Sequence, residues 1–249
     1  MSGFEKFQRA MIEAAKSHMD SSQERDDNAL AKVLNNHIFN LDGPKTITRE
    51  LTAKDRFFGK TFRQFLEIRK SVETLNDSLF YMGRFPFSGT KITPSRYLRF
   101  HVEAWLAEVY ILQERLRSYL KALERQHKKN PHFSAIRANC KHLDELISKT
   151  LGSVIKARGG HVHENRFSDD NIERLDTLDL LTLGREDDFS NLMSLHRRGE
   201  NRKVRKIWKD RIGANNKVIL ELLDMFFDAL FPLVFDEDSE TLRYPRGCQ

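Results

Sequence analysis

The most constraining feature of this chain is a helical pattern of large apolar residues that runs from Leu98 to Leu123. These residues recur at alternating steps of three and four, which places them along one side of an α-helix as a packing seam. The seam consists of Leu98, Val102, Trp105, Val109, Leu112, Leu116, Tyr119 and Leu123, and it extends for roughly 40 Å at the rise of an α-helix. No segment of useful length alternates as a β-strand does. The sequence therefore predicts an all-α fold, an antiparallel helical bundle with an N-terminal helical extension.

Local signals divide the chain into four parts. Gly43 and Pro44 interrupt the helical pattern, because glycine favours helix ends and proline cannot continue a helix. Thr93 is placed to cap the seam helix, with Pro94 at its first position. The expected parts are an N-terminal helical extension over 1–44, an aromatic-rich helical segment over 45–92 that packs on the bundle, the bundle itself over 93–235 and a loose C-terminal tail over 236–249.

Further helices are expected within the bundle after the seam helix. The first carries apolar residues from Ile136 to Ile155 and reaches Gly159 and Gly160, which are expected to end or kink it. The remaining segments are an acidic helix within 169–188, a basic stretch over 191–217 and a separate apolar helix over 218–235.

Composition and charge exclude several classes of protein. The chain of 249 residues has no run of about 18 apolar residues and no apolar leader at its start, so neither a membrane span nor secretion is expected. Its two cysteines, Cys140 and Cys248, have no neighbours at metal spacing and indicate a reducing cytoplasm. The net charge of +6 is compatible with nucleic-acid binding without requiring it. We therefore expect a cytoplasmic globular protein.

The residues best suited to chemistry lie between Arg158 and Phe167. Arg158 and His163 are the candidate catalytic pair, because arginine holds a phosphate through a forked contact and imidazole exchanges protons near neutral pH. The candidates for supporting roles are His161, Glu164 and Arg166. Such a set can act on a phosphate without a metal, and no cofactor is expected.

Arg158 and His163 form an Arg-x4-His pattern, and their context separates them from other copies of it. The same spacing occurs at Arg96–His101 and at Arg137–His142. Only the pair at 158 and 163 lies at a glycine break beside a second histidine and a glutamate.

This context resembles the HEPN superfamily, the higher-eukaryote and prokaryote nucleotide-binding helical domains. The resemblance covers about 93–235 and rests on Arg-Gly-Gly-His-Val-His-Glu at 158–164 and on the helix from Arg99 to Glu108. It implies a small bundle whose Arg-x4–6-His motif lies at a homodimer cleft. It also implies a metal-independent endoribonuclease of toxin or defence type, restrained by an antitoxin or another regulatory protein. Ribonuclease members usually have Asn, Asp or His after the arginine, where this chain has Gly159.

Two other roles remain open for the same residues. Arg158 and His163 could cap helix ends and bond a nearby carboxylate, Glu164 or Asp169. His161 and His163 could instead bind zinc, provided that the segment is extended, because neighbours two apart in a helix point away from each other. The candidates for a third zinc ligand are Glu164, His101 and Glu103.

The basic stretch from Arg197 to Arg211 is the second candidate site. Its expected inner side contains Val204, Ile207, Trp208 and Arg211, and its expected solvent side contains Arg202, Arg205, Lys206 and Lys209. The solvent side is either a track for an RNA backbone or a face that keeps the helix soluble. The acidic block over 169–188 could pair with this stretch, within the protein or across a dimer.

Two hypotheses of function follow. The first is a HEPN-like ribonuclease with a composite Arg158/His163 site at a homodimer cleft. The second is a helical dimerisation module that binds nucleotide, RNA or a partner protein without catalysis. Gly159 favours the second hypothesis, and the clustered Arg, His and Glu side chains favour the first.

Overall fold

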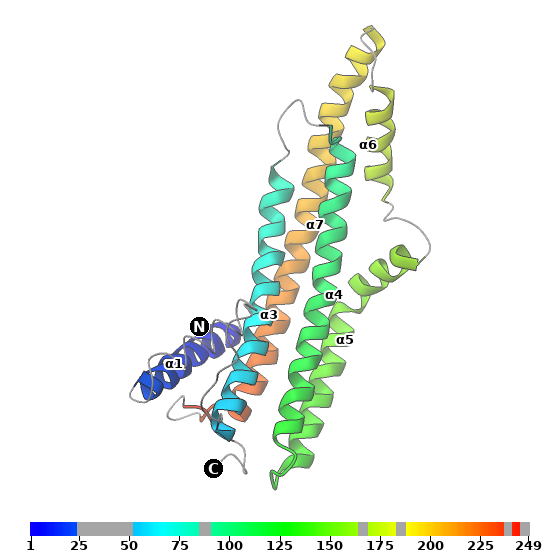
Figure 1. The fold of residues 1–249 in the computed structure, drawn as a ribbon. Helices are drawn as coiled ribbons and strands as arrows, with labels where there is room; N and C mark the ends of the chain where they lie inside the picture. The colour runs from blue at the N-terminus through cyan, green and yellow to red at the C-terminus, as the bar shows by residue number, and fades with distance from the viewer. Residues whose placement is uncertain (24–51, 85–90, 164–168, 183–187, 237–240, 245–249) are drawn as a thin grey trace. The chain divides into compact units, whose positions relative to one another are not determined.

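The computed structural model describes residues 1–23, 52–84, 91–163, 169–182, 188–236 and 241–244. This part of the chain forms helices α1 (Gly3–Gln23), α3 (Ala53–Gly83), α4 (Pro94–Gln126), α5 (Phe133–His163), α6 (Asp170–Leu181) and α7 (Asp188–Val234) (Figure 1). No strand occurs in these ranges, and a single antiparallel bridge joins Phe235 to Leu242. The expected all-α class is therefore confirmed. No helix in the described ranges has both the length and the hydropathy that crossing a bilayer requires.

Helix α4 carries the predicted seam, and every member of that seam is buried. The helix begins at Pro94, as expected, and the backbone N–H of Arg96 donates to Oγ1 of Thr93 at 3.4 Å. The cap predicted at Thr93 is therefore present.

Two helix boundaries differ from the sequence prediction. The basic stretch and the final apolar segment are not separate helices, because α7 continues for 47 residues through both of them. Buried residues recur at helical spacing along one face of α7, from Val204 through Ile212 and Ile219 to Phe226. This apolar face therefore continues through the point where the charge of the outer face changes. Helix α5 runs through Gly159 and Gly160 to His163, so of the end or kink expected at these glycines, the end is wrong.

The described residues divide into two compact units. Unit 1 contains residues 1–65, 119–143 and 223–249, and unit 2 contains residues 66–118 and 144–222. Helices α3, α4, α5 and α7 contribute to both units.

In unit 1, α1, which lies within the N-terminal extension expected over 1–44, contributes to the buried core. Phe7 is fully buried, and its ring contacts those of Phe65 at 5.5 Å and Phe227 at 4.6 Å between centroids. Helix α1 also begins in close contact with α7, since a Cβ on Gly3 would clash with the carbonyl oxygen of Asp224. Glycine is required there for this close approach.

Of the tail expected to be loose over 236–249, the structure describes residues 236 and 241–244, and these make backbone hydrogen bonds. The N–H of Arg243 donates to the carbonyl of Val234 at 2.8 Å, and that of Asp236 donates to the carbonyl of Thr241 at 2.8 Å.

In unit 2, a buried asparagine joins three helices. Nε1 of Trp105 on α4 donates to Oδ1 of Asn216 on α7 at 2.8 Å. Nδ2 of Asn216 donates to the carbonyl of Leu75 on α3 at 2.8 Å. Because an unpaired buried amide is costly, these bonds fix the register of the three helices.

Candidate functional site

Arg158 and His163 lie at the C-terminal end of α5. Five residues of α-helix separate their Cα atoms by about 140° around the axis and by roughly 7.5 Å along it. Their Cα atoms therefore lie on different sides of α5. The side chains from 157 to 163, and Glu164 and Arg166, lie outside the described part of the structure.

The zinc alternative required an extended chain at His161 and His163. The backbone is helical at both residues, and helical residues two apart lie about 160° from each other around the axis. The helical backbone therefore does not fit the zinc alternative.

Asp169 fixes the chain where it re-enters the described structure, six residues after His163. Its Oδ1 caps α6 by accepting the N–H groups of Asn171 at 3.1 Å and Ile172 at 3.4 Å. Its carboxylate also accepts Nε1 of Trp208 at 3.4 Å and Nη1 of Arg211 at 3.1 Å, both from α7. Burial alone would raise the pKa of Asp169, but the hydrogen bonds from Asn171, Arg211 and the helix N-terminus outweigh it and lower the pKa. Asp169 is therefore a structural anchor between α6 and α7.

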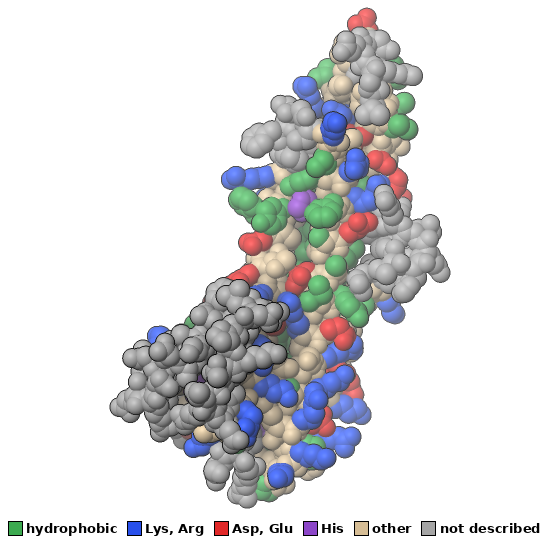
Figure 2. Space-filling model, in the orientation of Figure 1, with side chains coloured by type: hydrophobic (Ala, Val, Ile, Leu, Met, Phe, Trp, Pro, Cys, Tyr) green, Lys and Arg blue, Asp and Glu red, His purple; other side chains and the backbone are tan. Residues whose placement is uncertain are grey.

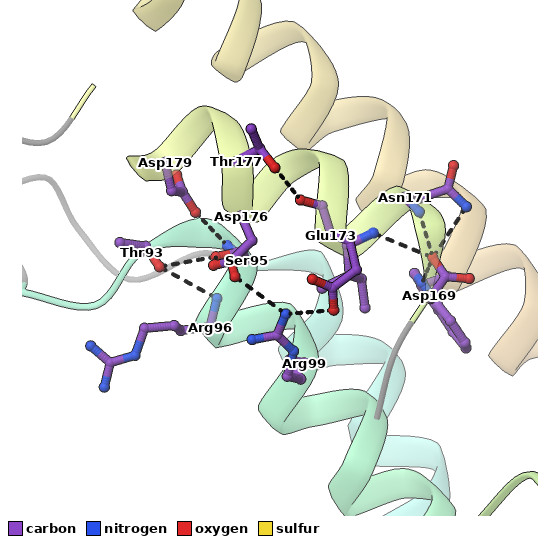
Figure 3. Close-up of polar contacts among 12 residues, drawn as sticks. Thr93, Ser95, Arg96, Arg99, Asp169, Asn171, Glu173, Asp176, Thr177 and Asp179 are labelled. Atoms are coloured by element: carbon purple, nitrogen blue, oxygen red, sulfur yellow. Dashed lines mark hydrogen bonds and ion pairs between the residues drawn. The ribbon is translucent and has the colours of Figure 1, made fainter. Parts of the chain in front are cut away.

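A second polar contact fixes α6 against the start of α4 (Figure 3). The N–H of Ser95 donates to Oδ2 of the buried Asp179 at 2.9 Å. The Ser95 hydroxyl donates to Oδ1 of Asp176 at 2.7 Å. Arg99 lies on the same side of α4, with Nη2 3.1 Å from Oε1 of Glu173. A carboxylate at a helix N-terminus also compensates the free N–H groups there.

The acidic block over 169–188 pairs with the basic stretch inside the protein, as one of the sequence interpretations proposed. Arg197 lies 3.5 Å from Asp179, and Arg211 lies 3.1 Å from Asp169. These contacts involve the two ends of the basic stretch.

The middle of the basic stretch is a stripe of three cations on α7. Arg202, Lys206 and Lys209 are exposed, and within the described residues none of them has an ion pair. Their spacings of four and three keep them within about 60° on one side of the helix. We call these three residues the cationic stripe.

Arg205 differs from the prediction that it faces solvent. It is partly buried, and its Nη2 donates to the carbonyl of Gly83 at the end of α3, at 2.6 Å. On the opposite side of this segment, Val204 and Trp208 are buried and Ile207 is partly buried, as predicted. Arg211 was expected on this inner side but is exposed. Arg211 covers the Trp208 ring, with its Cζ 5.1 Å from the ring centroid.

A group of aromatic side chains that the sequence analysis did not select lies beside this stripe. We call it the aromatic patch, and it consists of Phe80, Tyr81, Tyr97, Phe100 and His101. In Figure 2, hydrophobic side chains gather where α3 ends and α4 begins, with Lys and Arg side chains next to them. Burial lowers the pKa of His101, which keeps the imidazole neutral at pH 7. The sequence does contain a signal for this patch at Phe100. Phe100 lies midway between the seam residues Leu98 and Val102, so an α-helix places it on the side opposite the buried seam.

No protein-family model matches the chain, and neither a curated protein nor a solved structure shows significant similarity to it.

Proposed function

We propose that this chain is a HEPN-like, metal-independent endoribonuclease that acts in the cytoplasm as a homodimer. The observation that carries the proposal is the placement of Arg158 and His163 at the end of one continuous helix, α5. Because they lie about 140° apart around the axis, residues from two copies would complete the site. Such an activity needs restraint in a cell, which fits a toxin or defence role under an antitoxin or another regulatory protein.

The chemistry requires two proton transfers and a bound phosphate. The ribose 2′-oxygen attacks the phosphorus and loses its proton to a base, while the 5′-oxygen leaves and takes a proton from an acid. His163 of one copy serves as the base and His163 of the second copy as the acid, since a neutral and a protonated imidazole coexist near pH 6–7, roughly the ordinary pKa of histidine. Arg158 holds the phosphate and stabilises its developing charge.

A second candidate function is RNA binding without cleavage. Two observations favour it. Gly159 follows Arg158 where ribonuclease members of the superfamily usually have a polar residue, and the cationic stripe could hold phosphates without any chemistry. Cleavage therefore has to be tested separately from binding.

The experiment is incubation of the purified protein with single-stranded RNA in excess chelator. We expect cleavage of the RNA, and an all-deoxy strand of the same sequence should stay intact because it lacks the attacking hydroxyl. RNA that stays intact across several sequences, or cleavage that needs an added metal, contradicts the proposal. If the RNA stays intact, RNA binding without cleavage would remain as the candidate function.

Dimerisation is a separate prediction. Light scattering should give twice the chain mass at tens of micromolar protein. Gly160→Cys, placed in the motif, should form an intersubunit disulfide under mild oxidation, because a residue near a twofold axis meets its own copy. Lys141→Cys, an exposed position earlier in α5, is the matched control and should not crosslink. A monomer, or equal crosslinking at both positions, speaks against a dimer cleft at the motif.

The cationic stripe predicts a salt dependence of RNA binding. Replacing Arg202, Lys206 and Lys209 together with Gln should reduce the slope of log affinity against log salt by about 2, at roughly 0.7 per single-strand phosphate contact. The control is a triple Gln variant at a pocket elsewhere on the protein, which is lined by the basic residues Lys121, Arg125 and Lys128. If the control triple lowers the slope and the stripe triple does not, the RNA track lies elsewhere.

A further inference from the structure

The aromatic patch presents ring faces and edges to solvent from the ends of two helices. Phe80 is 55% exposed, Tyr81 is 49% exposed and Phe100 is 65% exposed. Scattered exposed apolar residues are ordinary on a protein surface, but contiguous aromatic groups mark a binding surface. The contacts within this patch show that the rings are contiguous. His101 stacks on Tyr81 with ring centroids 5.8 Å apart and planes 15° apart, and it contacts Phe100 at 5.3 Å.

Polar contacts hold the rings of the patch in place. The hydroxyl of Tyr97 lies 2.8 Å from the carbonyl oxygen of Tyr81 and 2.5 Å from that of Arg84. The Tyr97 ring in turn packs edge-on against His101, with centroids 4.3 Å apart. The end of α3 is therefore tied to the first turns of α4, and a ligand meets rings that are already positioned.

Two cations, Arg84 and Lys209, lie close to the patch. The guanidinium of Arg84 lies over the Phe80 ring, 4.4 Å from its centroid. Nζ of Lys209 lies 4.0 Å from the position that a Cβ on Gly83 would take, so the cationic stripe reaches the end of α3. The exposed Asp77 lies about one turn of α3 before Phe80. Rings and positive charges are thus adjacent.

We propose that the aromatic patch is a stacking platform for unpaired bases of a single-stranded RNA whose phosphates follow Arg84 and the cationic stripe. Exposed rings beside a basic track are the combination that binds single strands without reading their sequence. Paired bases cannot reach such rings, because their faces are covered within the duplex. That the strand is RNA rests on the proposed function, whereas the platform rests on side chains that the structure describes.

The platform is tested by binding, separately from cleavage. The probe is a 2′-O-methyl oligonucleotide that contains 2-aminopurine, which cannot be cut through its 2′-position and loses fluorescence when its base stacks on a ring. Phe80→Ala and Phe100→Ala should each weaken binding by a factor of about 5 or more and relieve the quenching. Phe100→Trp should bind as tightly as the wild type, and Phe100→Leu should resemble Phe100→Ala.

A matched control is Phe189→Ala, which removes another exposed phenylalanine from unit 2. Phe189 lies roughly 24 Å along α7 from Arg205, so its removal should leave binding unchanged.

The outcomes separate this proposal from the proposed function. Unchanged binding by Phe80→Ala and Phe100→Ala, or full binding by Phe100→Leu, overturns the platform even if the wild type cleaves RNA. Loss of self-association in these variants also overturns it, because the patch would then be a contact between two copies of the chain. Weakened binding together with unchanged dimerisation supports the platform, even if the wild type never cleaves RNA.

Discussion

Alanine at His163 should slow RNA cleavage by a factor of about 10²–10⁴ at neutral pH, because the site would lose its proton-transfer groups. Alanine at Arg158 should slow it by about 10²–10³, because the developing charge on the phosphate would lose its stabilising partner. Rates are measured in chelator with a labelled single-stranded RNA. Both variants should keep the helical content and the oligomeric state of the wild type.

The chain supplies a matched control for this experiment. Arg137 and His142 have the same spacing on the same helix, and both are exposed. Arg137→Ala and His142→Ala should leave the rate unchanged. Equal cleavage by His163→Ala and by the wild type would show that the motif is not catalytic. Equal loss of cleavage at both pairs would show that α5 had been disturbed as a whole.

Alanine at Trp208 should lower the free energy of unfolding by about 3–5 kcal/mol, the usual cost of removing a buried aromatic ring. Trp208 is 8% exposed and lies on the buried face of α7 between Val204 and Ile212. The substitution also removes an N–H donor to Asp169, which leaves the cap of α6 with one partner fewer. Urea denaturation followed by circular dichroism measures the change.

Lys209→Ala is the control for Trp208, because Lys209 is the exposed next residue on the same helix. Its effect should stay within about 0.5 kcal/mol. Trp208→Phe should lose less stability than Trp208→Ala, since it keeps most of the ring volume. A loss below about 1 kcal/mol in Trp208→Ala would mean that this ring is not part of the core of unit 2.

The fold class could be predicted from the sequence because the apolar spacing is local information. The α4 seam and its Thr93 cap depend on residues within one helix, and both are present. The boundary expected before Val218 depended on a change of charge, which affects only the outer face of α7. The inner face continues from Ile212 to Ile219, so burial keeps the helix intact.

The surfaces depend on partners that lie far away in the chain, which a single sequence does not reveal. Arg205 has the spacing of a solvent-facing residue, yet it bonds Gly83, 122 positions earlier. Phe80 and Phe100 become one patch only because α3 ends beside the start of α4. The motif residues were selected by residue type and context alone, and their side chains lie outside the described structure.

The most direct measurement is the chemistry of the product ends after cleavage of single-stranded RNA in excess chelator. Proton transfer by His163 at the 2′-oxygen predicts a 2′,3′-cyclic phosphate on one fragment and a 5′-hydroxyl on the other, and a single 2′-deoxy nucleotide at the cut should block the reaction. Three results would contradict this role of His163: a 3′-hydroxyl with a 5′-phosphate, cleavage at the deoxy nucleotide, or RNA that remains intact.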